Sequence, residues 1–316
     1  MKNVLVTGGC GIIGDRVCSG LLKKGYSVIA VDKQPSNYNI NKEHFKFYEA
    51  KPNDKAKYID IFETEDIDAI VHLACTVDND FGHIIDDEEI EITRECNKFF
   101  FKLAMASEIR QCLMVSTTQV YETPKTREPV REEDDIKITT NYAKLKYESE
   151  MAMADAFRGA RDASLAIMRI PPVYTFDYYE NLLAKIYDPK DETAFVYRTG
   201  EYGFQFCCVH NLADFILCFM RHADNPAYTG VYNVADKTLT RAAEIVGFLR
   251  EYHRLGAVIQ RKENPVTGLL SKLKGGKEEK TNYRYLDLKT LLNNTSYDTS
   301  KASRLCPFRW NLSNTK

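Results

Sequence analysis

A tyrosine and a lysine separated by three residues could together carry acid–base chemistry. Tyr142 and Lys146 fall in a stretch, 141–158, that predicts a helix, so their side chains lie one turn apart on one face. A tyrosine, with a reference pKa of about 10, is a poor base near neutrality, but a lysine ammonium beside it would stabilise the phenolate and lower that pKa. Thr117, at the end of an apolar run, offers a hydroxyl to the same reacting oxygen. We therefore identify Thr117, Tyr142 and Lys146 as candidate catalytic residues that take a proton from an alcohol.

Such pairs are common on helices and are a weak signal by themselves. This pair points to catalysis because the start of the chain predicts a dinucleotide-binding fold. Three glycines at three-residue spacing, Gly8, Gly11 and Gly14, separate a short apolar strand from a helix expected at 13–24. Gly8 allows a sharp turn, and Gly11 has no Cβ to block a pyrophosphate. Gly14 lets the helix and the strand pack closely, while the helix N-terminus directs N–H groups at phosphates. This arrangement predicts a dinucleotide site.

An acidic residue favours NAD over NADP at that site. Asp32 ends the second apolar run, 28–31, and lies 18 residues after Gly14. A carboxylate there can accept hydrogen bonds from both ribose hydroxyls and would repel a 2′-phosphate. Lys33 beside it could offset part of that repulsion. The residues expected to bind the cofactor NAD are Gly8, Gly11, Ile12, Ile13, Gly14, Asp32, Lys33, Leu73, Ala74, Ser116, Tyr142 and Lys146.

The alternation of strands and helices predicts an α/β fold, a doubly wound parallel sheet of the NAD-binding Rossmann type. Further strands are expected at 45–48, 69–73, 112–115 and 165–168, and helices at 89–108 and 141–158. In a doubly wound order the fourth strand lies beside the first, so residues 72–74 would line the crevice, with His72 as a structural residue. We expect this domain to span residues 1–174.

Beyond residue 174 the regular alternation breaks down, which indicates a smaller C-terminal α+β lobe over 175–316. Some of its segments could return to the main sheet. Helices are expected there at 178–186, 212–222 and 241–253. The stretch 268–282 is polar and rich in lysine, which is typical of a mobile surface loop; gripping a phosphate is the weaker alternative.

Composition excludes several classes of protein. The net charge of −2 does not indicate a basic surface for binding nucleic acid. No apolar run approaches the length of a membrane span. Because the first strand begins within three residues of the start, we expect no signal peptide. Nine cysteines, most of them in apolar runs, suit reduced thiols in the cytoplasm. Six scattered histidines show no metal-ligand spacing, so we expect no metal.

Taken together, the motifs resemble the extended short-chain dehydrogenase/reductases, the NAD-dependent epimerase/dehydratase family. The resemblance implies Thr117, Tyr142 and Lys146 as the catalytic set, a C-terminal lobe that binds the substrate, often a nucleotide sugar, and a homodimer built on the helices at 89–108 and 141–158. The matching segments are Thr7-Gly8-x-x-Gly11-x-x-Gly14, Asp32, His72-Leu73-Ala74, Ser116-Thr117-x-x-Val120-Tyr121, Tyr142-x-x-x-Lys146, Arg169-x-x-x-Val173-Tyr174, 209–213, 230–234 and 298–302.

Two departures from the family pattern bear on the substrate. Pro172 stands where members acting on nucleotide sugars commonly carry an asparagine, and Pro171-Pro172 is more similar to members acting on steroids, flavonoids or other small alcohols. Thr118-Gln119 stands where dehydratases of the family carry an acid and a base. The leading interpretation is an NAD-dependent epimerase or oxidoreductase acting on a sugar or nucleotide sugar. The alternatives are an NAD(P)-dependent dehydrogenase or reductase of a non-sugar alcohol or ketone and, less favoured, a catalytically inactive NAD-binding regulator.

Overall fold

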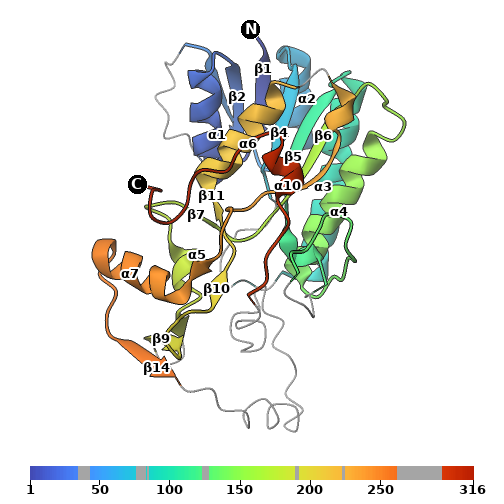
Figure 1. Ribbon diagram of the computed structural model, residues 1–316. Helices are drawn as coiled ribbons and strands as arrows, with labels where there is room; N and C mark the ends of the chain where they lie inside the picture. The colour runs from blue at the N-terminus through green and yellow to red at the C-terminus, as the bar shows by residue number, and fades with distance from the viewer. Residues whose placement is uncertain are drawn as a thin grey trace.

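The computed structural model describes residues 1–34, 43–75, 83, 85–122, 128–188, 192–222, 225–261 and 294–316. Its centre is a seven-stranded parallel sheet in the order β12-β6-β5-β4-β1-β2-β3 (Figure 1). The strands are β1 (Asn3–Thr7), β2 (Ser27–Asp32), β3 (Phe45–Glu49), β4 (Ala69–His72), β5 (Gln111–Thr117), β6 (Ser164–Ile170) and β12 (Gly230–Asn233). The order reverses between β1 and β4, which confirms the predicted doubly wound α/β fold.

Helices cover both faces of this sheet because its strands are apolar on both sides. Val4 and Val6 of β1 pack in one core with α1 (Ile12–Lys23) and α6 (Val209–Met220). Leu5 of the same strand packs in a second core. That core is formed with α2 (Lys55–Thr64), α3 (Asp87–Ala106) and α4 (Asn141–Ala156).

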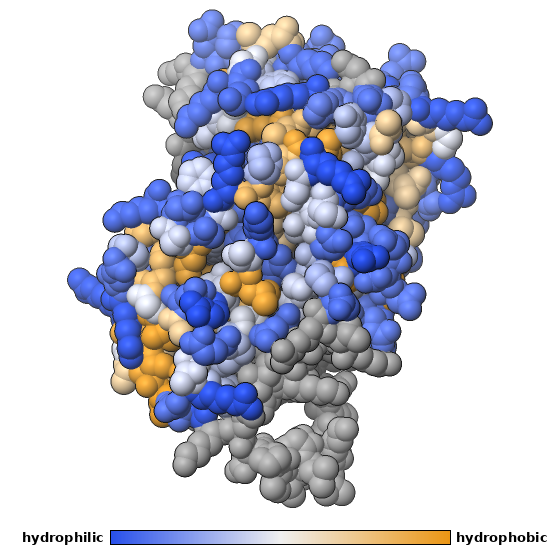
Figure 2. All heavy atoms as spheres, viewed as in Figure 1, coloured by the Kyte–Doolittle hydropathy of each residue, from blue (hydrophilic) through white to orange (hydrophobic). Residues whose placement is uncertain are grey.

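A third core forms the C-terminal lobe. It joins the segment after β6 to α7 (Ala242–Tyr252) and includes Tyr174, Leu182, Phe206 and Ile245. Its small sheets pair β7 (Val173–Tyr174) with β11 (Cys207–Cys208), β10 (Gly203–Phe204) with β13 (Thr240–Arg241), and β9 (Thr193–Tyr197) with both β8 (Tyr187–Asp188) and β14 (Val258–Arg261). On the face shown in Figure 2, hydrophobic surface gathers around β14, where Ile259 is exposed.

Three predictions for the C-terminal part need correction or fall outside the described residues. The helix expected at 212–222 in the second lobe is α6, which covers the main sheet beside α1 because its apolar side, including Phe215 and Ile216, completes that core. The helix expected at 178–186 is reduced to the single turn of α5 (Glu180–Leu183). The stretch 268–282 lies outside the described residues. β12 lies beside β6 in the main sheet, and the domain division at residue 174 stays a prediction.

Candidate functional site

The glycine loop turns back on the end of β2. Gly8 has φ +73°, and its N–H donates to the carbonyl of Val31 over 2.7 Å. A Cβ placed on Gly14 would lie 2.1 Å from the carbonyl oxygen of Gly8, so no side chain fits there. At Gly11 a Cβ would meet only the Gly8 oxygen, at 3.5 Å. The loop therefore needs Gly8 and Gly14 for its own packing, whereas the space in front of Gly11 is open to a ligand.

The same loop presents a helix N-terminus. Gly11 is the N-cap of α1 and supplies no side-chain acceptor for the first N–H groups of the helix. A helix N-terminus of this kind attracts a phosphate through its N–H groups and its dipole. The open space at Gly11 and this N-terminus together fit a dinucleotide pyrophosphate.

Asp32 lies where the glycine loop meets the end of β2. Its Oδ2 accepts the N–H of Cys10 (2.9 Å), and its Oδ1 accepts the N–H of Gln34 (3.0 Å). An ionised carboxylate has about four acceptor positions, so two remain for the hydroxyls of a ribose. The carboxylate is thus fixed by the backbone in the place that the sequence predicted for it.

A cavity of about 510 Å³ joins this loop to the predicted catalytic residues. Thr117 reaches it from the end of β5, and Tyr142 and Lys146 reach it from α4. The N–H of Gln119 donates to Oγ1 of Thr117 (3.2 Å). Nζ of Lys146 donates to the carbonyl of Val115 (3.3 Å), which holds the ammonium against β5.

Tyr142 is half-buried where it lines this cavity. Burial raises the pKa of its phenol above the ordinary value, and the nearby Cys75 and Tyr178 raise it further. The lowering of this pKa by Lys146 together with a positive nicotinamide concerns the cofactor complex and stays a prediction. A cationic group bound in the cavity would favour the phenolate.

The structure separates the remaining predicted site residues into two groups. Ile12, Ile13 and Leu73 line the cavity together with the three glycines. Lys33, Ala74 and Ser116 do not line it, and neither does Asp32. The N–H of Ala74 donates to Oγ1 of Thr7 (3.3 Å), and the hydroxyl of the buried Ser116 donates to Oε1 of Glu150. The side chain of Ser116 thus contacts protein rather than the cavity.

The structure adds cavity residues that sequence reasoning did not assign to the site. Cys10 lies in the glycine loop and Cys75 follows β4, while Tyr178 and Asn181 come from the segment after β7. The amide of Asn181 donates to the carbonyl of Val173 (2.8 Å). The glycine motif draws attention to Cys10, but no local pattern marks Tyr178 or Asn181. Their position depends on how the C-terminal lobe folds back over the sheet.

Two absences apply to the described part of the chain. Its residues contain no group of three histidine, cysteine or acidic side chains that could hold a metal ion. Within the same ranges, no helix combines the length and the apolar character needed to cross a bilayer. The nine cysteines all lie in these ranges, and none of them forms a disulfide.

The comparison with protein families identifies this arrangement. The model of the NAD dependent epimerase/dehydratase family matches residues 4–235, which include the glycine loop, Asp32 and the three candidate catalytic residues. The chain belongs to this family. NAD is the cofactor of the NAD dependent epimerase/dehydratase family, and the match confirms the predicted cofactor. The catalytic and binding roles of individual residues stay predictions.

Individual relatives in the epimerase/dehydratase family match only part of this chain, at low to moderate identity. A dTDP-D-glucose 4,6-dehydratase of Dictyostelium discoideum is 33% identical over 132 residues, covering 38% of this chain and 30% of the relative. A UDP-glucose 4-epimerase of Bacillus subtilis (strain 168) is 26% identical over 179 residues, covering 52% of this chain and 51% of the relative. The chain thus spans about half or less of the length of these relatives.

Among solved structures, the fold is similar to the UDP-glucose 4-epimerase from Bifidobacterium longum in complex with NAD⁺ and UDP. The TM-score is 0.71 at 19% identity, and the alignment covers 99% of this chain and 96% of that chain. At this identity the likeness shows the shared fold alone.

Proposed function

We propose that this protein is an NAD-dependent epimerase or oxidoreductase that moves hydride to and from a secondary alcohol carbon, with a sugar or nucleotide sugar as substrate. The observation that carries the proposal is the single cavity lined by Gly11, Thr117, Tyr142 and Lys146. The glycine loop, which would hold the cofactor, and the proposed proton-transfer residues line the same cavity. A regulator that only binds NAD would have no use for this second set, which makes that alternative the weakest.

The three side chains divide the proton chemistry among them. The Tyr142 phenolate accepts the proton of the substrate alcohol, and Thr117 donates a hydrogen bond to the same oxygen. Lys146, held on β5, stabilises the phenolate and binds the nicotinamide ribose. NAD, when bound, supplies the hydride acceptor, and its positive nicotinamide adds cationic charge that favours the phenolate of Tyr142.

Nucleotide sugars are the substrate class that the relatives support. By their names, the two relatives described above act on dTDP-D-glucose and on UDP-glucose. In an epimerase, the hydride returns to the other face of the keto intermediate, and no acid or base beyond Thr117, Tyr142 and Lys146 is required. We therefore place epimerisation slightly ahead of net oxidation.

A panel of UDP-, GDP- and dTDP-hexoses tests this proposal if both the sugar and the cofactor are followed. Interconversion of epimers without release of free NADH is the expected result. Stoichiometric release of NADH on a nucleotide sugar would replace epimerisation by net dehydrogenation.

A non-sugar alcohol or ketone is the second candidate, because Pro171 and Pro172 line the cavity. Two prolines offer no backbone N–H and no polar side chain to a sugar diphosphate. Turnover of a steroid- or flavonoid-type alcohol, together with none on any nucleotide sugar, would establish this candidate instead.

We propose that residues 1–174, with α6 and β12, bind NAD and that most of 175–316 binds the substrate. Nine cysteines without a disulfide suit the reducing cytoplasm, which is the location we propose. The proposed homodimer would use α3 and α4, whose outer sides expose Ile92 (42%) and Met151 (38%). Light scattering of the wild type and of Ile92→Glu/Met151→Glu tests it: a dimer that becomes a monomer is expected, and a monomeric wild type contradicts it.

A further inference from the structure

The helix that carries Tyr142 and Lys146 is fastened by polar side chains one turn farther along. Ser149 and Glu150 of α4 are 3% and 1% exposed. A surface helix ordinarily buries apolar side chains, whose contacts are not directional. Hydrogen bonds are directional, so the partners of these two residues fix how α4 is oriented over the sheet.

Glu150 connects three elements of the site. Its carboxylate accepts two bonds from the guanidinium of Arg169 on β6, Nε to Oε1 (3.1 Å) and Nη2 to Oε2 (2.7 Å). The hydroxyl of Ser116 on β5 donates to Oε1 as well. Ser116 directly precedes Thr117, and Glu150 follows Lys146 by one turn. One carboxylate therefore ties the strand that bears Thr117 to the helix that bears Lys146.

Arg169 is itself held in place. Its guanidinium lies 4.9 Å from the ring centroid of Tyr121, and Nη1 donates to the carbonyl of Glu132 (3.4 Å). Burial favours the neutral form of this side chain, but its hydrogen bonds with Glu150 raise the pKa of Arg169 above the ordinary value, so the charge is kept. A two-pronged contact of this kind restricts the relative position of both partners more than a single hydrogen bond does.

A buried ion pair contributes little net stability compared with apolar residues of the same shape, because desolvation offsets the attraction. The main contribution of the Glu150–Arg169 pair is therefore to fix the orientation of α4 relative to the strands, because its contacts are directional. We propose that Glu150, together with Ser116 and Arg169, is a positioning residue that sets Thr117 against Tyr142 and Lys146. This inference rests on the proposed function, since it needs those three residues to be catalytic.

The same helix turn contains a matched control. The hydroxyl of Ser149 donates to the carbonyl of Leu145 (2.9 Å) and accepts from the amide of Asn97 on α3 (2.7 Å). Asn97 in turn bonds His72 of β4 (3.1 Å). Ser149 thus matches Ser116 in residue type and burial, but it fastens α4 to α3 and β4 rather than to the strand of Thr117.

Ser116→Ala and Ser149→Ala each remove one buried hydroxyl and leave the ion pair in place. Turnover is measured per NAD-binding site, so that partial unfolding does not count as lost catalysis, and thermal unfolding is recorded for both. We expect Ser116→Ala to lower kcat by about tenfold, because small misplacements of reacting groups are costly. Its KM and its affinity for NAD should stay within about twofold of wild type. Ser149→Ala should keep kcat within about twofold at a comparable loss of Tm.

A second measurement does not depend on turnover. The Tyr142 phenol, labelled with ¹³C at Cζ and assigned with Tyr142→Phe, is titrated by NMR in the NAD complex. If Ser116 holds Lys146 close to Tyr142, the titration midpoint should rise by roughly half a unit in Ser116→Ala and stay unchanged in Ser149→Ala. Arg169→Lys, which keeps the charge but loses the two-pronged contact, should behave like Ser116→Ala.

Equal kcat values and equal midpoints for the two serine variants would overturn the positioning role. A wild type that turns over no substrate would instead refute the proposed function, and the NMR comparison would then decide the positioning role by itself.

Discussion

The backbone N–H of Gln119 donates a hydrogen bond to Oγ1 of Thr117 over 3.2 Å. Because this oxygen accepts that bond, the hydroxyl hydrogen of Thr117 is the part that can be given to another oxygen in the cavity that both residues line. The side chain of Gln119 is held too, since its Oε1 accepts from the hydroxyl of Thr140, the N-cap of α4 (3.2 Å). The end of β5 and the start of α4 are thereby joined beside Thr117.

Removing the phenol hydroxyl should abolish most turnover. Tyr142→Phe keeps the ring, so the affinity for NAD should stay nearly unchanged, while the rate falls by about 10²–10⁴-fold, the usual contribution of a general acid–base group. Steady-state kinetics and NAD titration check both parts. A variant that keeps more than about a tenth of the wild-type rate would show that Tyr142 is not the base.

The pH dependence of the reaction rate should follow the ionisation of the Tyr142 phenol. Burial raises the pKa of Tyr142, and oxidation of an alcohol needs the deprotonated phenolate. The rate of oxidation should therefore rise with pH up to the pKa of Tyr142 in the NAD complex, whereas the rate of reduction, which uses the neutral phenol, should fall above it. Rate profiles in both directions test this, and an oxidation rate that falls as the pH rises would contradict it.

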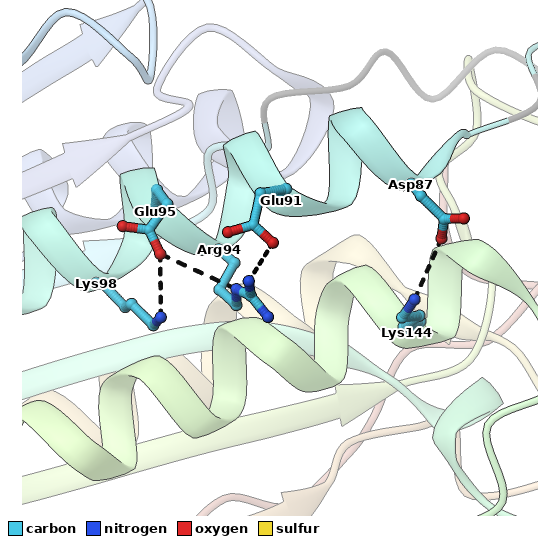
Figure 3. Close-up of polar contacts among 6 residues, drawn as sticks. All are labelled: Asp87, Glu91, Arg94, Glu95, Lys98 and Lys144. Carbon is cyan, nitrogen blue, oxygen red and sulfur yellow. Dashed lines mark hydrogen bonds and ion pairs between the residues drawn. The ribbon is translucent and has the colours of Figure 1, made fainter.

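Substitution of the two lysines of α4 near Tyr142 should have very different effects on turnover. Lys146 is buried and bonded to β5, whereas Lys144 points away toward Asp87 of α3, with Nζ 3.2 Å from Oδ1 (Figure 3). We expect Lys146→Met to lower turnover by about 10²-fold or more. Lys144→Met, the control, loses only an exposed ion pair worth roughly 0–1 kcal/mol and should keep the wild-type rate. Equal losses in the two variants would remove Lys146 from the catalytic set.

Substitution of Gly14 and of Gly11 by alanine should impair different properties, stability in the first case and NAD affinity in the second. Gly14→Ala places a methyl group 2.1 Å from the Gly8 carbonyl and should destabilise the fold, seen as a lower Tm. Gly11→Ala meets its nearest atom at 3.5 Å, so the protein should fold normally and lose NAD affinity by about tenfold or more as the methyl group enters the pyrophosphate space. Wild-type NAD affinity in Gly11→Ala would place the pyrophosphate elsewhere.

The cofactor preference should depend on the charge of Asp32. The wild type should bind NAD more tightly than NADP, because a 2′-phosphate would face this carboxylate. Asp32→Asn keeps an oxygen for the N–H of Cys10 and removes the charge, so the preference should shrink by roughly tenfold. Isothermal titration with both cofactors measures the ratio, and tighter binding of NADP by the wild type would refute the role of Asp32.

We expect no 4,6-dehydratase activity, although one curated relative bears that name. Elimination of water from the hexose needs an acid and a base beside the catalytic threonine, and here Thr118 and Gln119 occupy those positions. A hydroxyl and an amide do not titrate near neutral pH. Incubation with dTDP-glucose and NAD, followed by mass spectrometry, tests this: a 4-keto-6-deoxy product would contradict the prediction.

The sequence by itself determined the parts of this protein that local geometry controls. The three-residue spacing of the glycines predicts the positive φ of Gly8 and the close packing at Gly14. The one-turn separation of Tyr142 and Lys146 follows from the period of the helix. The apolar runs likewise predicted the strands and their doubly wound order, since right-handed crossovers leave few arrangements.

Only the tertiary structure decided what distant segments do together. Glu150 and Arg169 pair across a helix and a strand, and α6 covers the main sheet although it follows the first segments of the lobe. Tyr178 and Asn181 reach the cavity because the chain after β7 folds back over the carboxyl ends of the strands. Such contacts depend on the relative placement of whole elements, for which burial and directional hydrogen bonds decide and no short sequence pattern exists.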